Sequence, residues 1–363
     1  MFTQNRINEE RVGARRPRDD SSRDARADFR RFFRRDPEPP DVSNPEPPDV
    51  SDPQRTRASS AQSTDDADET PTVAACQMAV TDLDVAANLD AVVERATDLP
   101  TETDVALFPE YALTGFVADE RVRSAALARD DDALGRLRAV ADETGTALLV
   151  GFVEDAGEAC YNAVAYLAPD GTATVYRKRH LWGGEADVLA HGNERVTVET
   201  PVGTTGLLTC YDLNFVGESA AFARSEVDAL FVVGAWPAAH SENWRLLLRA
   251  RALDGVRWVV GAGRTGQKSL ADSTAPVESA SDAASDVAAD AASDVAADAA
   301  SDVAADAANA SQTRYAGRSL VVRPDGSVAA GLNRGERDLV AHLDPNVLAE
   351  CREFIPVHED ARR

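Results

Sequence analysis

Three chemically different side chains each follow a short apolar run in this sequence. Glu110 follows Val-Ala-Leu-Phe-Pro, Lys178 follows Thr-Val-Tyr-Arg, and Cys210 follows Gly-Leu-Leu-Thr. An apolar run that ends in a reactive residue is typical of a buried strand that delivers a side chain to the edge of a sheet. If the three strands share a sheet and end at one rim, we expect a thiol, a carboxyl group and an amine to meet in one pocket.

A cysteine, a carboxylate and an ammonium group can together cleave a bond at a carbonyl or nitrile carbon. The thiol must become a thiolate in order to attack such a carbon atom. A carboxylate within hydrogen-bond reach can accept the thiol proton, and an ammonium group stabilises first the thiolate and then the oxyanion that attack creates. The sequence therefore indicates nucleophilic catalysis with Cys210 as the nucleophile, Glu110 as the base and Lys178 as the cation.

Each of these residues also has an ordinary structural interpretation when it is considered alone. Free cysteine is among the most buried residue types, so Cys210 could be an inert core residue. Glu110 could be a charge at the end of a strand, and Lys178 could be a solvated lysine. The functional hypothesis depends on the three residues meeting in space.

The elements that must position these residues alternate between strands and helices. This alternation, together with hairpins at Pro169-Asp170-Gly171 and Pro324-Asp325-Gly326, predicts a layered α/β sandwich. Strands are predicted at 72–80, 104–108, 147–153, 161–167, 172–177, 205–209, 229–233, 256–262, 318–322, 327–331 and 338–343, and helices at 84–97, 132–144, 217–225 and 242–254.

Two segments do not fit a folded core. Residues 1–71 are rich in Arg, Asp, Pro and Ser, and we expect a disordered tail, or a start codon assigned too far upstream. Residues 267–312 repeat Ala-Ala-Ser-Asp-Val-Ala-Ala-Asp, and a period of eight gives no continuous apolar stripe, so we expect a low-complexity insertion in a surface loop. The remainder, 72–360, is expected to form one domain.

The composition excludes several classes of partner. A formal net charge of −24 argues against nucleic acid and anionic membrane, because like charges repel. The sequence has no run of about 18 apolar residues, so we expect no transmembrane helix. The four cysteines are widely separated and have no histidine clustered beside them, so neither a metal site nor a disulfide framework is expected, and a reducing cytoplasm is the default location.

The charged residues also suggest adaptation to salt. Acidic residues and alanine are abundant, and the only lysines are Lys178 and Lys268. This composition is typical of proteins that stay soluble at high salt, although high-GC coding alone would also favour arginine and alanine.

Three motifs resemble those of the nitrilase superfamily of carbon–nitrogen hydrolases, and they occur in the order that this family shows. Leu-Phe-Pro-Glu-Tyr-Ala-Leu-Thr-Gly-Phe (107–116) resembles its glutamate motif, Tyr-Arg-Lys-Arg-His-Leu-Trp (176–182) its lysine motif, and Thr-Cys-Tyr-Asp-Leu-Asn-Phe (209–215) its nucleophile motif. Further similarity through 244–266 and 315–326 extends the resemblance over about 72–360.

The resemblance implies roles for individual residues. Cys210 would be the nucleophile, Glu110 the general base, and Lys178 the oxyanion stabiliser together with the backbone N–H of Tyr211. Glu185 would orient the lysine or the substrate, and Trp236 would line the pocket, although it could equally be a core indole. The resemblance further implies a four-layer α-β-β-α sandwich that forms a homodimer or a higher homo-oligomer. We expect no cofactor.

The segments around Lys178 and Trp236 look most like the omega-amidase branch of the family, whose members hydrolyse small 2-oxo dicarboxylic monoamides. The expected substrate is thus a small amide that releases ammonia or an amine. A nitrilase, an N-carbamoyl amide hydrolase and a catalytically silent binding protein of the same fold remain alternatives. Three departures from the family pattern lie outside the triad and leave the shape of the pocket open. Glu218 stands one residue later than the usual Phe-Pro-Glu, Asp254-Gly255 replaces the common Glu-Asn, and Arg318 replaces a common histidine.

Overall fold

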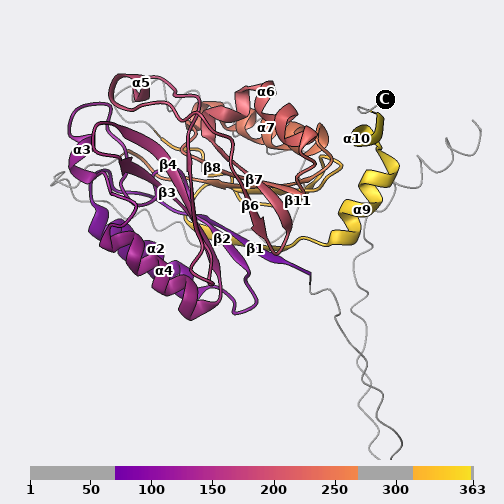
Figure 1. Ribbon diagram of the computed structural model, residues 1–363, viewed down its shortest axis with the longest axis horizontal. Coiled ribbons are helices and arrows are strands. Elements are labelled where there is room, and N and C mark those ends of the chain that lie inside the picture. Colours follow the sequence, from indigo (N-terminus) through magenta and orange to yellow (C-terminus); the bar gives the residue numbers. More distant parts are fainter. Residues whose placement is uncertain (1–69, 269–313, 361–363) are drawn as a thin grey trace, which may run out of the picture. The chain divides into compact units, whose positions relative to one another are not determined.

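The computed structural model describes residues 70–268 and 314–360, which form two six-stranded sheets with helices outside them (Figure 1). Across the first sheet, the strands follow the order β12 (Arg337–His342), β1 (Thr72–Gln77), β2 (Val105–Leu107), β3 (Ala147–Asp155), β4 (Cys160–Leu167) and β5 (Ala173–Arg177). Across the second, the order is β11 (Val328–Gly331), β10 (Leu320–Val322), β9 (Trp258–Gly263), β8 (Ala229–Gly234), β7 (Gly203–Thr209) and β6 (Thr197–Thr200).

The longer helices form the two outer layers of the sandwich. In Figure 1, α2 (Val85–Asp98) and α4 (Asp132–Thr144) lie beside the first sheet, whereas α6 (Val216–Arg224) and α7 (Ser241–Leu253) lie beside the second. The chain also forms α9 (Pro345–Phe354) and several shorter elements. These are α3 (Val122–Ala125), α5 (Glu185–Val188), α10 (Val357–Asp360) and the 3₁₀ turns η2 (Cys210–Asn214) and η3 (Ala238–His240).

Alternating side chains along each strand explain why four layers form. In β1, Ala74 and Cys76 pack in the core under α2 and α4, while Val73 points into the core between the two sheets. In β8, Leu230 packs toward α7, whereas Phe231 faces the first sheet. Successive strand residues point to opposite faces, so a strand that is apolar at every position must be covered on both sides. The observed α-β-β-α sandwich therefore confirms the expected fold class.

Capping side chains define where the helices of the first layer begin. Asp84 accepts a hydrogen bond from the Ala87 N–H at the start of α2, and Asp131 accepts one from the Ala133 N–H at the start of α4. An aspartate at the N-cap stabilises a helix because it satisfies an N–H group that has no partner within the helix. These two helices cover the outer face of the first sheet. The first sheet carries Glu110 and Lys178.

The three strands that lead to the candidate catalytic residues do not share one sheet. The strands β2 and β5 belong to the first sheet, but β7, which precedes Cys210, belongs to the second. The condition that all three strands share one sheet is therefore not met. Because β2 and β5 run in the same direction through β3 and β4, Glu110 and Lys178 emerge at the same rim, and Cys210 approaches them from the facing sheet.

The predicted helices and strands are all present, with ends that differ by a few residues. Sequence analysis did not predict β6, in which Val198 is the only buried residue, or α9, in which only Leu348 and Cys351 are buried. The predicted tail at 1–71 and the predicted octapeptide insertion at 267–312 lie outside the described residues, except for 70–71 and 267–268. The chain enters and leaves that insertion through a bridge between Gln267 and Arg314.

Candidate active site

Glu110 lies in a tight loop that follows β2 and packs directly against β3. Its side chain is 1% exposed, and its Oε2 atom accepts a hydrogen bond of 2.7 Å from the backbone N–H of Ala235, which follows β8 in the facing sheet. The close packing requires glycine at position 151, because a Cβ atom there would lie 2.4 Å from the Pro109 carbonyl oxygen and 2.6 Å from the Tyr111 nitrogen. The backbone therefore fixes the Glu110 carboxylate between the two sheets.

Lys178 is the first residue after β5, and its side chain is also 1% exposed. Its backbone N–H donates to the Asn162 carbonyl oxygen at 2.8 Å, which extends the pairing of β4 and β5 by one residue. Its Nζ atom lies 2.8 Å from Glu110 Oε1, and 3.0 and 2.9 Å from the two carboxylate oxygens of Glu185. The ammonium group is thus held by two carboxylates within the protein.

Glu185 begins α5, and donors surround its carboxylate. Besides Lys178, the Asn162 side chain donates to Oε1 at 2.9 Å, the Tyr111 hydroxyl donates to the same oxygen, and the Trp182 N–H donates to Oε2 at 2.7 Å. A buried carboxylate is tolerated only when its oxygens are paired in this way. All hydrogen-bonding capacity of Glu185 is spent inside the protein, so its position suits orienting Lys178 better than contacting a substrate.

Cys210 stands between the end of β7 and the turn η2, with a left-handed backbone φ of 46°. Such a conformation is strained for a residue other than glycine and persists only where the surrounding structure imposes it. Cys210 is 8% exposed, and the charges of Glu110, Lys178 and Glu185 all act on the pKa of its thiol, so these three groups lie near it. The structure therefore brings Glu110, Lys178, Glu185 and Cys210 into one cluster.

The charges in this cluster determine its protonation. Burial raises the pKa of the Cys210 thiol well above its usual value. The negative charge of Glu110 raises this pKa further, and this effect is larger than the opposite effect of the positive charge of Lys178. Burial lowers the pKa of Lys178, but the charges of Glu110 and Glu185 outweigh burial and raise it overall. Burial and the same two carboxylates raise the pKa of Tyr111. The resting site therefore holds a neutral thiol, a protonated lysine and a neutral tyrosine.

Tyr211 and Trp236, the two other predicted substrate-binding residues, flank the nucleophile. Tyr211 is partly exposed in the first turn of η2, where backbone N–H groups have no partner within the helix. Trp236 belongs to the same apolar cluster as Cys210, and its ring centroid lies 5.6 Å from that of Trp244. Its indole N–H donates to the His240 carbonyl oxygen at 2.9 Å, and this hydrogen bond fixes the orientation of the ring.

Sequence reasoning missed two side chains that tie the cluster together. Asn162 on β4 donates to both Glu110 Oε1 at 2.7 Å and Glu185 Oε1, and it thereby bridges the two carboxylates. Tyr111, with a backbone φ of 61°, reaches Glu185. A signal for Asn162 was present, because asparagine is depleted in strands and this one interrupts an otherwise apolar segment.

Comparison with known proteins agrees with the fold and with the motifs. The sequence profile of the carbon–nitrogen hydrolase family matches residues 72–353. The chain belongs to the carbon–nitrogen hydrolase family.

Relatives within this family include enzymes named amidases. The chain is 28% identical to the omega-amidase YafV of Escherichia coli (strain K12) over 265 residues, which cover 72% of this chain and 85% of that protein. It is 29% identical to an (R)-stereoselective amidase of Pseudomonas sp over 190 residues, which cover 52% of this chain and 69% of the relative.

Solved structures of proteins from the same superfamily have the same fold as this chain. A CN-hydrolase superfamily protein from Xanthomonas campestris, with an arsenic adduct in its active site, aligns with a TM-score of 0.65 at 23% identity, covering 80% of this chain and 97% of that one. An amidase from Nesterenkonia sp. aligns with a TM-score of 0.60 at 20% identity, covering 79% and 95%. At these identities the likeness concerns the fold alone.

Local partners accommodate two of the departures from the family pattern. Glu218 is 3% exposed and accepts hydrogen bonds from Arg179 and, at 2.8 Å, from Arg195, so it joins the lysine segment to the start of α6. Arg318 is 5% exposed with a φ of 55°, and its guanidinium lies 3.7 Å from Glu242. Both residues lie inside the family fold and are not exposed surface charges.

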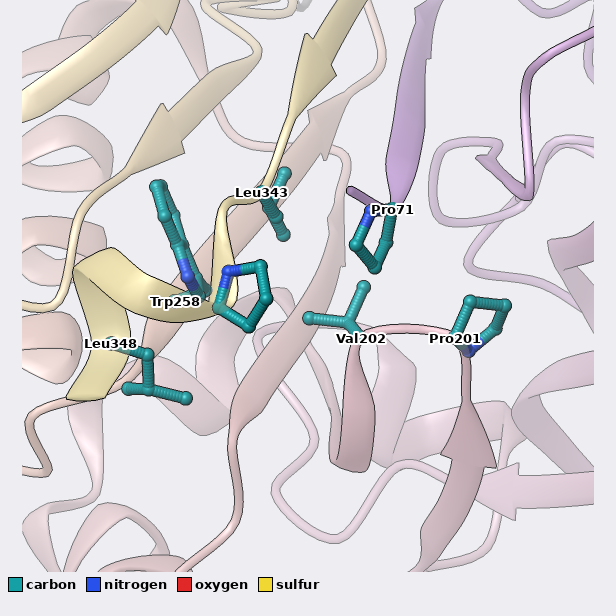
Figure 2. A pocket seen from close by; sticks show the side chains of 7 residues that line it. Pro71, Pro201, Val202, Trp258, Leu343 and Leu348 are labelled. Carbon is teal, nitrogen blue, oxygen red and sulfur yellow. The ribbon is translucent and has the colours of Figure 1, made fainter. Parts of the chain in front are cut away.

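An apolar pocket lies away from this cluster. Its volume is about 100 Å³, and Figure 2 shows Pro71, Val202 and Trp258 among its lining residues. Trp258 begins β9 and pairs with the first residue of β8, so the pocket opens at the opposite end of the parallel strands from Cys210. No titratable side chain lines it, and it offers no chemistry of its own.

Neither a metal site nor a membrane span occurs in the described part of the chain. Within residues 70–268 and 314–360, no group of three or more His, Cys, Asp and Glu side chains is arranged to hold a metal ion. In the same residues, no helix has the length and apolarity needed to cross a bilayer.

Proposed function

We propose that this chain is a cysteine amidase that hydrolyses a small amide through a thioester intermediate. The observation that carries the proposal is the buried cluster in which the Lys178 ammonium lies 2.8 Å from Glu110 Oε1 and the charges of both groups act on the buried Cys210 thiol. The amidase names of the family relatives support the same reaction class.

In the first half of the reaction, the thiol of Cys210 attacks the amide carbonyl carbon as its proton passes to Glu110. Because burial raises the pKa of the thiol, the attack needs a nearby base to accept the thiol proton, and Glu110 supplies it. The developing oxyanion is stabilised by Lys178 and by the backbone N–H of Tyr211. The C–N bond then breaks, the leaving nitrogen takes the proton from Glu110, and ammonia or an amine departs from the thioester.

In the second half, water replaces the amine at the carbonyl carbon. A water molecule gives a proton to Glu110 as its oxygen attacks the thioester, and the same donors hold the second oxyanion. The C–S bond breaks, the sulfur atom takes the proton back from Glu110, and a carboxylic acid is released. One carboxylate thus serves as base and then as acid in each half.

The substrate proposed first is a small oxo-acid monoamide, as hydrolysed by omega-amidases. The resemblance around Lys178 and Trp236 and the similarity to YafV support this substrate. Nitrile or N-carbamoyl hydrolysis is the alternative within the family, and turnover of a nitrile or release of carbon dioxide would identify it. A silent binding protein of the same fold would release nothing from any of these compounds.

We further propose that the chain acts in the cytoplasm as a homodimer or higher homo-oligomer, with its helical face at the interface. Leu246 and Leu253 on α7 are 63% and 48% exposed, and Val216 at the start of α6 is 66% exposed. Large apolar side chains exposed together on one helical layer suit a contact with a second copy.

The decisive experiment measures ammonia release at high potassium chloride from small amides, oxo-acid monoamides, carbamoyl compounds and nitriles. The Cys210→Ala variant should release no ammonia from any amide that the wild type hydrolyses. Cys76→Ala is the matched control, because Cys76 is 0% exposed in the core under α2 and should not affect turnover. Turnover retained by Cys210→Ala would refute the proposal.

A further inference from the structure

Asp212, two residues after the nucleophile, is a fully buried carboxylate that plays no part in the proposed mechanism. Its side chain is 0% exposed, and each of its oxygens has two hydrogen-bond partners. Oδ2 accepts from the Tyr176 hydroxyl at 2.6 Å and from the Thr209 N–H at 3.1 Å. Oδ1 contacts the His180 backbone N–H at 3.0 Å and its ring Nδ1 at 2.8 Å. All acceptor positions of the carboxylate are therefore occupied.

These partners belong to the two segments that must meet for catalysis. Thr209 precedes Cys210 at the end of β7 in the second sheet, whereas Tyr176 and His180 flank Lys178 at the end of β5 in the first. One carboxylate thus ties the nucleophile turn to the lysine segment across the interface between the sheets.

The backbone of Cys210 needs such a constraint. Its φ of 46° is a conformation that a cysteine does not hold unless its neighbours impose it. The bond from the Thr209 N–H to Asp212 closes the turn from inside, and Arg251 donates to the Leu213 carbonyl oxygen at 2.8 and 3.2 Å from outside. Without the inner bond, the turn can relax and move the sulfur atom away from Glu110.

His180 joins this carboxylate to the outer part of the site. Its ring stacks on Phe215 with the ring centroids 3.6 Å apart, and its Nε2 atom lies 3.7 Å from Glu218 Oε1. Arg179 and Arg195 hold Glu218 in turn. The imidazole is fixed on three sides, so Nδ1 is presented to Asp212 in one orientation.

We propose that Asp212 is a positioning residue that acts through the Thr209 N–H on one side and through His180 on the other, and that these contacts set the distance between the Cys210 sulfur and the Lys178 ammonium group. The inference rests on the proposed function, because it assigns a task within the same site. Asp212 does not touch the reacting atoms, and its effect reaches them through the turn on one side and through the lysine segment on the other.

Asp212→Asn tests the positioning of the nucleophile. An amide nitrogen placed at the position of Oδ2 would face the Thr209 N–H, and both groups are hydrogen-bond donors. The hydrogen bond from Thr209 is therefore lost, while the side chain keeps its shape. Because a misplacement of about 1 Å can cost about 100-fold in rate, we expect kcat per titrated Cys210 to fall about 100-fold, with KM within about threefold. Asp228→Asn is the control, since Asp228 accepts a backbone N–H from Thr204 at 3.0 Å at the other end of β7. It should lower the melting temperature and leave kcat unchanged.

Two substitutions of His180 test the role of the ring nitrogen. Asparagine places its amide nitrogen near the position of Nδ1 and can still donate to Asp212, whereas glutamine places it near Nε2, on the side of Glu218. We expect His180→Asn to keep most of kcat and His180→Gln to lose about tenfold or more. Equal losses in both variants would overturn the proposal, as would an unchanged kcat per titrated site in Asp212→Asn.

Alkylation by iodoacetamide separates this proposal from the proposed function. The rate at which Cys210 is alkylated, followed by peptide mass spectrometry, needs no amide turnover. Slower alkylation in Asp212→Asn and His180→Gln, but not in His180→Asn, would support positioning even if the wild type released no ammonia. Identical alkylation rates in wild type and all three variants would refute positioning even if the enzyme proved to be an amidase.

Discussion

Replacing Glu185 with glutamine removes one negative charge from a cluster in which every carboxylate oxygen already accepts hydrogen bonds. If the glutamine carbonyl takes the position of Oε1, it keeps the donors Tyr111 and Asn162. Its amide nitrogen then faces the Trp182 N–H and the Lys178 ammonium, which are donors 2.7 and 2.9 Å from Oε2. Two buried hydrogen bonds are lost. Of the two carboxylates that contact Lys178 in the wild type, only Glu110 remains.

The size of the effect follows from these contacts. Leaving a buried polar group without a partner costs about 1–3 kcal/mol, so we expect Glu185→Gln to destabilise the fold by about 3 kcal/mol. For a domain of this size, such a change lowers the melting temperature by about 6–12 °C. A lysine that is no longer aimed at the oxyanion should lower kcat about 100- to 1000-fold, as removal of one oxyanion donor does.

Glu154→Gln provides a matched control. Glu154 is 1% exposed, compared with 4% for Glu185, and it accepts hydrogen bonds from Arg177 at 2.7 and 2.8 Å and from Arg129 at 2.5 Å, but from none of the cluster residues. Ammonia release and thermal unfolding are measured for both variants. Glu154→Gln should lose a similar amount of stability and keep kcat within about threefold. Equal losses of kcat in the two variants, or none in Glu185→Gln, would refute the assigned role of Glu185.

Three further perturbations test other parts of the site and surface. Because burial raises the pKa of Cys210, its thiolate fraction grows tenfold per pH unit from pH 7 upward; its alkylation rate should therefore still rise above pH 9, and a plateau below pH 8 would contradict this. Gly151→Ala should displace Glu110 and lose most activity, because the new Cβ atom would lie 2.4 Å from a carbonyl oxygen. Gly135→Ala in α4 is the control. A Cβ atom there meets nothing within 4 Å, so this substitution should be neutral or should stabilise the fold by up to about 1 kcal/mol. Leu246→Asp, at a side chain 63% exposed on α7, should convert the proposed dimer into monomers in sedimentation velocity, and an unchanged mass would exclude this face from the interface.

Local sequence patterns were sufficient to predict most helices and strands. Apolar runs such as 229–233 predicted strands, and in the structure the side chains of β8 contribute to two cores. The missed elements have weak patterns: α9 buries only Leu348 and Cys351, and β6 buries only Val198. A helix or strand that contributes so little to a core leaves little periodicity to detect.

The sequence by itself determined which reactive groups this protein possesses, because Glu110, Lys178 and Cys210 each follow an apolar run and lie in motifs that resemble those of one family. Only the tertiary structure decided how they meet. Cys210 comes from the second sheet and the other two residues from the first, while Asn162 and Asp212 link segments far apart in the chain. The physical reason is that periodicity records which face of a strand is buried, whereas contacts between side chains depend on how two sheets pack, and packing joins residues with no fixed separation along the chain.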